Sequence, residues 1–195
     1  MPVLKIIIAS TRPGRVGASV GAWITSVARQ HQGFTVEVLD LAEIALPLMD
    51  EPHHPRLAKY TQDHTKAWSA SIAGADAFVF VMPEYNYSFT APLKNALDYL
   101  FAEWQHKPVG LVSYGGVSGG LRAAQQIKQV VTTLSMMPLV EAVTIPMVAS
   151  LVVDGVLQPT EPMELSAGAM LDSLVRWEKA LRTLRPVIET DEDVA

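Results

Sequence analysis

The sequence LKIIIAS (4–10) runs without a break into TRPGRVGAS (11–19), and a helical pattern follows. The apolar run is typical of a parallel strand that is buried on both faces. The first N–H groups of a helix have no partner within the helix, so such a strand-to-helix junction can bind an anion. Hydroxyls and arginines that suit phosphate oxygens gather here: Ser10, Thr11, Arg12, Arg15 and Ser19. This corner is therefore either a phosphate site or a solvated turn whose arginines face water.

Strands and helices are predicted to alternate along the rest of the chain. Apolar runs predict strands at 3–9, 34–39, 77–82, 109–113 and 139–145. Apolar residues spaced three and four apart predict helices at 16–32, 64–73, 90–104, 120–136 and 163–184. Asp154-Gly155 predicts a small hairpin before the last helix. The pattern indicates one doubly wound α/β domain over residues 1–188, with a parallel sheet covered by helices on both faces, and an acidic flexible tail at 189–195.

The composition narrows the class of protein. The chain has 195 residues, of which 49% are hydrophobic and 18% charged, with a net charge of −5 and no cysteine. These values indicate a globular domain without disulfides, thiolate metal sites or a catalytic thiol. No basic face for nucleic acid and no apolar run of about 20 residues for a membrane helix is visible. The N-terminus has no export signal, so we expect a cytoplasmic location.

Two further loops follow predicted strands and suit a ligand. The first, PEYNYSFTA (83–91), places aromatic rings where a planar heterocycle could rest, although these rings could simply cover the next helix. The second, SYGGVSGG (113–120), lets the backbone approach a ligand closely, although its glycines could serve only a tight turn. Ligands of doubly wound sheets bind at the carboxyl ends of strands. A phosphate at the first corner and a flat ring at the other two loops predict a mononucleotide.

Three segments together resemble the NADPH-dependent FMN reductases of the flavodoxin-like superfamily: STRPGRVG (10–17), PEYNYSFTAPLKNALDYL (83–100) and SYGGVSGGLRA (113–123). The resemblance covers about residues 3–145 in matching order. It implies a flavodoxin-like sheet with strand order 2-1-3-4-5. Ala9 stands where the family usually has glycine, and Arg15 stands where some members have serine, so Arg15 would contact either the FMN phosphate or the phosphate of NADPH.

The resemblance also assigns residues to the cofactor. The FMN phosphate would be held by the first corner, through Ser10, Thr11, Arg12, Arg15 and Val16. The isoalloxazine would be lined by the second loop, through Pro83, Glu84, Tyr85, Asn86 and Tyr87. Its pyrimidine side would contact the third loop, through Ser113, Tyr114, Gly115, Gly116, Ser118 and Gly119.

The implied activity is hydride transfer from NADPH or NADH to FMN, and then to a small acceptor, by a ping-pong mechanism. The flavin N5 carries the chemistry, so no catalytic side chain is assigned. The acceptor could be a quinone, an azo compound, a metal oxyanion or free flavin. The resemblance further implies a homodimer or homotetramer, with some support from Trp104 and the apolar stretch 146–157.

Three alternatives compete with this interpretation. Gly116-Val117-Ser118-Gly119-Gly120 matches the nucleophile elbow of serine hydrolases, but every histidine precedes Ser118, whereas that class needs one downstream. A flavodoxin-like electron carrier would dock on protein partners, yet carriers are strongly acidic and bind the phosphate without arginines. Asp50, Glu51, His53 and His54 could hold a metal, but prolines stiffen this loop, and we expect no metal.

Overall fold

The computed structural model describes residues 1–185 and contains one five-stranded sheet. Its strands are β1 (Val3–Ile8), β2 (Thr35–Asp40), β3 (Ala77–Pro83), β4 (Pro108–Tyr114) and β5 (Met137–Ile145). They lie in the order β2-β1-β3-β4-β5, and every neighbouring pair is parallel. The predicted fold class and strand order are therefore confirmed. The domain limit at 188 and the acidic tail at 189–195 lie outside the described residues.

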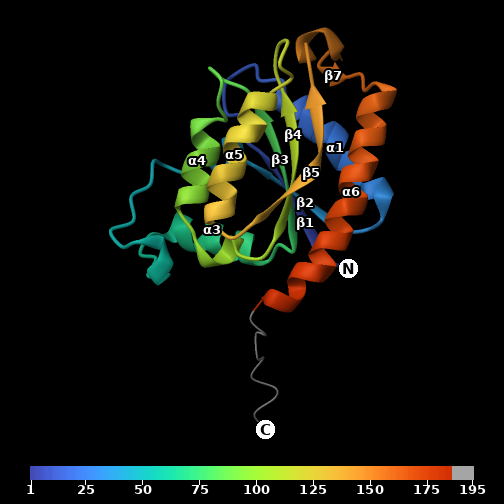
Figure 1. Cartoon of the computed structure of the whole chain (residues 1–195). Coiled ribbons are helices and arrows are strands. Elements are labelled where there is room, and N and C mark those ends of the chain that lie inside the picture. Colours follow the sequence, from blue (N-terminus) through green and yellow to red (C-terminus); the bar gives the residue numbers. More distant parts are fainter. Residues whose placement is uncertain (186–195) are drawn as a thin grey trace.

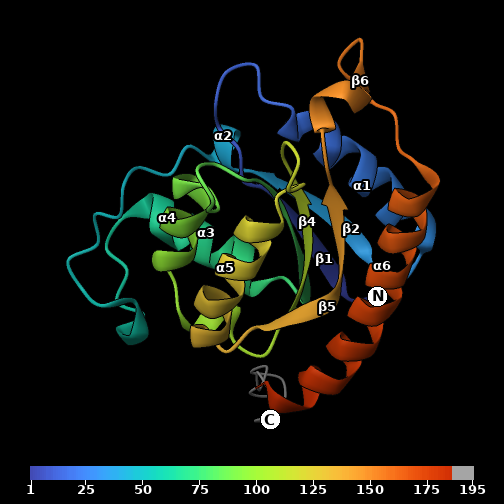
Figure 2. The same ribbon diagram turned by 45° about the horizontal axis from the view of Figure 1, so that its top comes forward.

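Helices cover both faces of the sheet (Figures 1 and 2). One face carries α1 (Gly17–His31) and α6 (Glu161–Leu181), and the other carries α3 (Asp63–Ala73), α4 (Ala91–Asp98) and α5 (Leu121–Thr133). A short α2 (Leu41–Ile44) follows β2. No helix within residues 1–185 is long and apolar enough to cross a membrane.

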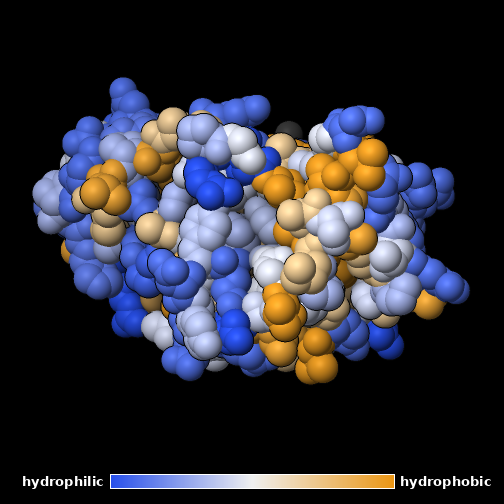
Figure 3. Space-filling view, turned by 90° about the horizontal axis from the view of Figure 1, so that it is seen from above, coloured by the Kyte–Doolittle hydropathy of each residue, from blue (hydrophilic) through white to orange (hydrophobic). Residues whose placement is uncertain are grey.

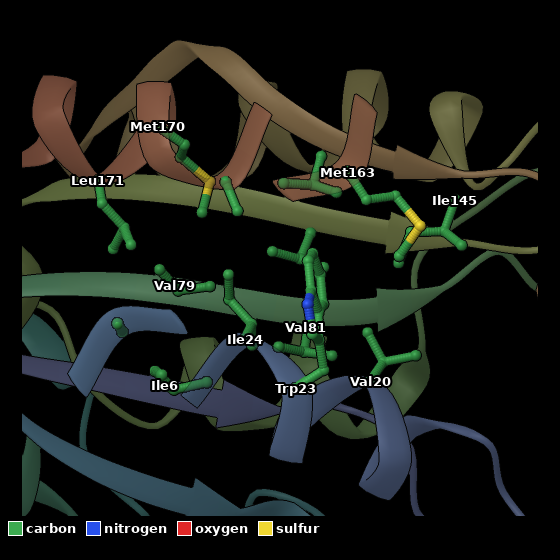
Figure 4. Close-up of a cluster of buried hydrophobic side chains, with 14 of the residues drawn as sticks. Ile6, Val20, Trp23, Ile24, Val79, Val81, Ile145, Met163, Met170 and Leu171 are labelled. Carbon is green, nitrogen blue, oxygen red and sulfur yellow. The ribbon is translucent and has the colours of Figure 1, made fainter. Parts of the chain in front are cut away.

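Each face of the sheet packs into its own hydrophobic core. Figure 4 shows the first core, where side chains of α1 such as Trp23 meet those of α6 such as Met170 over the sheet. Every residue of β3 and β4 is buried, as the continuous apolar runs predict for strands covered on both faces. Burial of this apolar surface fixes the sheet, and the sheet in turn fixes where its carboxyl-end loops lie.

One predicted helix is shorter in the structure. The apolar pattern predicts a helix over 90–104, but α4 ends at Asp98 and Trp104 lies in a short 3-10 helix at Ala102–Trp104. The chain turns there because Trp104 packs against Phe78 and Phe80 in the second core and is fully buried. Trp104 therefore offers no surface to a second subunit, and its use as support for a dimer was wrong.

The predicted hairpin is present between β6 (Val152–Val153) and β7 (Val156–Leu157), which pair antiparallel. Its two turn residues, Asp154 and Gly155, have φ angles of 50° and 78°, as a two-residue hairpin turn requires. The last helix begins at Glu161, two residues earlier than the apolar pattern predicts, because Pro162 is accommodated in its first turn.

Candidate ligand-binding site at the carboxyl ends of the strands

A cavity of about 440 Å³ opens at the carboxyl ends of β1, β3, β4 and β5. Four loops line it: Arg12, Arg15 and Val16; Pro83, Glu84 and Tyr85; Tyr114, Gly115 and Gly116; and Met147 to Ser150. The strand order reverses between β1 and β3, and ligands of open α/β sheets bind at such a switch point. Three of these loops are the ones that the sequence indicates.

The first corner holds polar atoms without partners. The hydroxyl oxygens of Ser10, Ser19 and Tyr114 are buried and have no hydrogen-bond partner in the described part of the chain. Helix α1 begins at Gly17, beside two of these hydroxyls: an added Cβ there would lie 2.0 Å from Ser10 Oγ and 2.5 Å from Tyr114 Oη. Ser19 lies within α1 and lines a separate pocket with Trp23. Val16 caps this helix without a side-chain hydrogen bond, so the first N–H groups of α1 remain open. Buried donors of this kind, at the positive end of a helix, suit an anion.

The two arginines of this corner have different surroundings. Arg15 makes a bidentate pair with Asp40, at 2.7 and 2.5 Å, and also donates to the Ser10 carbonyl oxygen at 2.6 Å. Its guanidinium therefore holds the loop against the end of β2. Arg12 is exposed and has no ion-pair partner among residues 1–185. Arg12 is thus the free cation at the cavity, whereas Thr11 lines a neighbouring pocket against α2 and α4.

Burial also affects the Tyr114 hydroxyl. It raises the pKa of Tyr114 to about 12, while the nearby Ser10 hydroxyl and the charges of Arg15 and Arg12 act in the opposite direction. The phenol therefore keeps its proton at neutral pH and remains a hydrogen-bond donor.

The β3–α4 loop folds into a tight turn. Tyr85 and Ser88 exchange backbone hydrogen bonds at 2.9 and 3.0 Å, and Asn86 and Tyr87 between them have φ angles of 49° and 72°. Tyr85 lines the cavity, whereas Asn86 and Tyr87 do not. The Glu84 N–H donates to the Tyr114 carbonyl oxygen at 2.9 Å, so this loop extends the pairing of β3 with β4.

The glycines of the β4–α5 loop divide into two groups. Gly119 and Gly120 have φ angles of 60° and 85°, and a Cβ on either would collide with neighbouring backbone, so these two serve the turn. Gly116 faces open space and lines the cavity with Gly115. The Ser113 hydroxyl donates to the Gly119 carbonyl oxygen at 3.1 Å and holds the loop closed. The Ser118 hydroxyl accepts a hydrogen bond from the Gly120 N–H at 3.4 Å.

The fourth wall of the cavity was missed by sequence reasoning, which interpreted 146–157 as a hairpin and an apolar surface. The Met147 N–H donates to Gly116 O at 2.8 Å, and the Val148 N–H donates to Gly115 O at 3.1 Å. These hydrogen bonds hold the segment against the glycine loop. The rule that ligands bind at the carboxyl ends of strands applies to β5 as much as to β4, and it could have found these residues.

The residues of the rejected alternatives have other partners. Within residues 1–185, no histidine is hydrogen-bonded to Ser118, and His64, for example, contacts Asp50 at 2.9 Å. Glu51 accepts hydrogen bonds from the backbone of Thr61 and Gln62, just before α3. Over the same described range, no three histidine, aspartate or glutamate side chains gather as a metal would need.

The fold and the cavity together define a flavodoxin-like, mononucleotide-binding α/β protein. The sheet order, the open helix N-terminus with its unpaired hydroxyls, and the cavity at the switch point all belong to that class. The comparisons with known proteins identify the family within it.

The chain belongs to the NADPH-dependent FMN reductase family, whose model matches residues 1–150. An NAD(P)H-dependent FMN reductase of Schizosaccharomyces pombe is 42% identical over 162 residues, which cover 81% of this chain and 80% of that protein. An NAD(P)H:quinone oxidoreductase of Solanum tuberosum is 43% identical over 68 residues, or 33% of this chain and 35% of its own. The solved structure of FerB, a flavoenzyme NAD(P)H:(acceptor) oxidoreductase from Paracoccus denitrificans, has the same fold, with a TM-score of 0.73, 19% identity, and coverage of 92% and 98%. The resemblance in the sequence is thus confirmed, and the chain is an oxidoreductase.

Proposed function

We propose that this protein uses FMN to pass a hydride from NADPH or NADH to a small acceptor. The observation that carries the proposal is the first corner, where the buried hydroxyls of Ser10 and Tyr114 lie beside the start of α1 and have no partner in the described part of the chain. The phosphate of FMN would supply the acceptor oxygens that these groups need. The family membership supports the same cofactor. When bound, FMN supplies the redox chemistry through its N5 position.

The chain's own residues bind and orient the cofactor. Ser10, Tyr114 and the first turn of α1 would hold the phosphate, with Arg12 adding a charge and Arg15 fixing the loop through Asp40. Backbone N–H groups of the glycine loop near Gly116 would face the pyrimidine edge and stabilise negative charge on it. Tyr85 and Met147 would bound the flat ring from two different loops.

One cavity would serve both the nicotinamide and the acceptor. No GxGxxG motif follows a strand of this chain, so nothing indicates a separate dinucleotide site of the Rossmann type. The two substrates would then use the open cavity in turn, which gives ping-pong kinetics. Quinones are the acceptor class that the matched NAD(P)H:quinone oxidoreductase suggests, and azo compounds, metal oxyanions and free flavin are the further classes in our proposal. A nicotinamide nucleotide as electron donor fits the expected cytoplasmic location.

We also propose that the protein forms a homodimer or homotetramer. Met147, on the segment after β5, lines the cavity and is exposed, and Val153 and Val156 of the hairpin that follows are exposed apolar residues as well. Figure 3, which looks down on the carboxyl ends of the strands, shows apolar side chains gathered on the hairpin side. Burial of this face would extend the wall of the site.

An electron carrier is the alternative function, since flavodoxins share the fold. The modest net charge of −5 and the free Arg12 favour the reductase, because carriers are more acidic and use no arginine at the phosphate. A carrier would accept electrons only from protein partners, whereas a reductase oxidises NADPH without the help of another protein.

The deciding experiment is an anaerobic titration of the purified protein. We expect a yellow protein, or one that becomes yellow with added FMN, whose flavin absorbance disappears on addition of NADPH and returns on addition of a quinone. Steady-state rates at several fixed quinone concentrations should give parallel double-reciprocal lines. A protein that cannot be loaded with FMN would contradict the proposal, and one that holds FMN but is not reduced by NADPH or NADH would favour the carrier.

A further inference from the structure

Arg122, the second residue of α5, joins the two loops that would flank the flavin. Its Nη1 donates to Glu84 Oε1 at 2.7 Å, and its backbone N–H donates to Glu84 Oε2 at 3.1 Å. Its guanidinium lies 4.0 Å from the centre of the Tyr87 ring, at cation–π distance. We call Glu84, Tyr87 and Arg122 the clamp. The clamp therefore connects the β3–α4 loop to the start of α5, which directly follows the glycine loop.

The Glu84 carboxylate is the buried member of the clamp. Its side chain is 8% exposed, whereas that of Arg122 is 47% exposed. The carboxylate also lies at the positive end of α5, where a negative charge is favourable. Burial acts to raise the pKa of Glu84, but hydrogen bonds from Arg122 and Ser118 outweigh it, and the pKa lies below its ordinary value. Glu84 is thus held as an anion.

The loop that the clamp holds is strained. Asn86 and Tyr87 both occupy the left-handed region of the backbone, which is costly for residues other than glycine. Two side chains of α5 hold the loop in this conformation. Gln126 Nε2 donates to the Tyr87 carbonyl oxygen at 2.8 Å, and Arg122 stacks on the Tyr87 ring. Without these contacts the turn would have less to hold it in this conformation.

Arg122 and Tyr87 do not line the cavity themselves, whereas Glu84, Tyr85, Gly115 and Gly116 do. The clamp can therefore affect a bound flavin only through the loops that it fixes. A loop that is already ordered loses less conformational entropy when a ligand binds.

We propose that Arg122 is a positioning residue for FMN, which fixes the loop carrying Tyr85 against the glycine loop before the cofactor binds. This inference rests on the proposed function. Arg122 is exposed and lies outside the cavity, yet it would raise the affinity for FMN. This effect on affinity is distinct from any effect on the stability of the fold.

The test compares Arg122→Gln with a matched control, Arg182→Gln. Arg182 is also an exposed arginine paired with a buried carboxylate, Glu178 at 2.6 Å, but it follows α6 in a short 3-10 helix, Arg182–Leu184. FMN dissociation constants are measured on the full chain by quenching of flavin fluorescence, and thermal unfolding is measured without FMN. We expect R122Q to raise the dissociation constant roughly tenfold, as loss of a charge-assisted hydrogen bond does, and R182Q to leave it unchanged.

A second variant separates charge from stacking. Arg122→Lys keeps a cation for Glu84 but loses the planar group over Tyr87, so we expect an intermediate dissociation constant. An FMN dissociation constant of R122Q equal to that of R182Q would overturn the inference, whatever happens to the melting temperature. Failure of the wild-type protein to bind FMN would instead contradict the proposed function itself.

Discussion

At the scale of single residues, Gly17 places the start of α1 against the phosphate corner. A Cβ here would lie 2.0 Å from Ser10 Oγ and 2.5 Å from Tyr114 Oη, so Gly17→Ala must displace the hydroxyls that we assign to the phosphate. We expect G17A to lose about 1–3 kcal/mol of stability, as overpacking does, and to bind FMN at least about tenfold more weakly. Gly168→Ala is the control, since an added Cβ there meets nothing within 4 Å, and it should stabilise α6 by about 0.5–1 kcal/mol. Equal FMN affinities of the two variants, measured by fluorescence quenching, would place the phosphate elsewhere.

The sequence predicts which residues belong to the site more readily than it predicts which side chains pair with one another. The pattern of hydroxyls and arginines after the first strand indicates an anion site, and the structure places Ser10 there with an unpaired hydroxyl. The pairing of Arg15 with Asp40 could not be foreseen, because it joins the loop after β1 to the last residue of β2, and only the parallel pairing of β1 with β2 brings these together. The bond from Arg122 to Glu84 has the same origin in the pairing of β3 with β4.

At the scale of elements, the carboxyl end of α3 depends on a buried lysine. Lys107 Nζ donates to the carbonyl oxygens of Ile72 and Ala73 at 2.9 and 3.0 Å. Burial lowers the pKa of Lys107 to about 8, and the charge of Arg185 acts in the same direction. The folded protein therefore releases this proton before the unfolded chain, whose lysine has a pKa of 10.5, so the contribution of Lys107 to stability rises between about pH 8 and pH 10.5.

Lys107→Met removes the titration and tests this sign. We expect the unfolding free energy of the wild type, relative to that of K107M, to increase with pH across the same window in urea denaturation. The other titrating groups should change the unfolding free energy of both proteins with pH in the same way, so the difference between the two unfolding free energies reports on Lys107. If the unfolding free energies of the two proteins changed in parallel with pH, burial would not lower the pKa of Lys107.

Elements with continuous apolar runs could be predicted well, and those that depend on tertiary contacts could not. The strands β3 and β4 were predicted because burial on both faces leaves them apolar up to Ser113 and Tyr114 at the carboxyl end of β4. The end of α4 was misplaced, since Trp104 continues the helical spacing but packs as part of a separate turn. The short α2 has too few residues for a periodic pattern, and it forms because Asp40 caps it from the end of β2.

At the scale of the whole molecule, the cavity collects loops from four of the five strands, so a ligand that fills it stabilises the entire sheet. A ligand that binds only the folded state at about 100 times its dissociation constant adds about 2.7 kcal/mol to the unfolding free energy. We expect FMN to give this stabilisation. Riboflavin at the same concentration should give much less, because without a phosphate it leaves the Ser10 and Tyr114 hydroxyls unpaired.

Arg12→Ala tests how much the positive charge of Arg12 contributes to FMN binding, apart from the hydroxyls and the helix start of the phosphate corner. Arg12 is exposed and has no ion-pair partner in the described part of the chain, so its loss should leave the fold intact while narrowing the difference between FMN and riboflavin. Thermal unfolding of both proteins with each ligand measures that difference. Equal stabilisation of the wild type by the two flavins would mean that the unpaired hydroxyls do not meet a phosphate. The cavity would then bind a ring but no mononucleotide, because the phosphate contacts are what distinguish the two ligands.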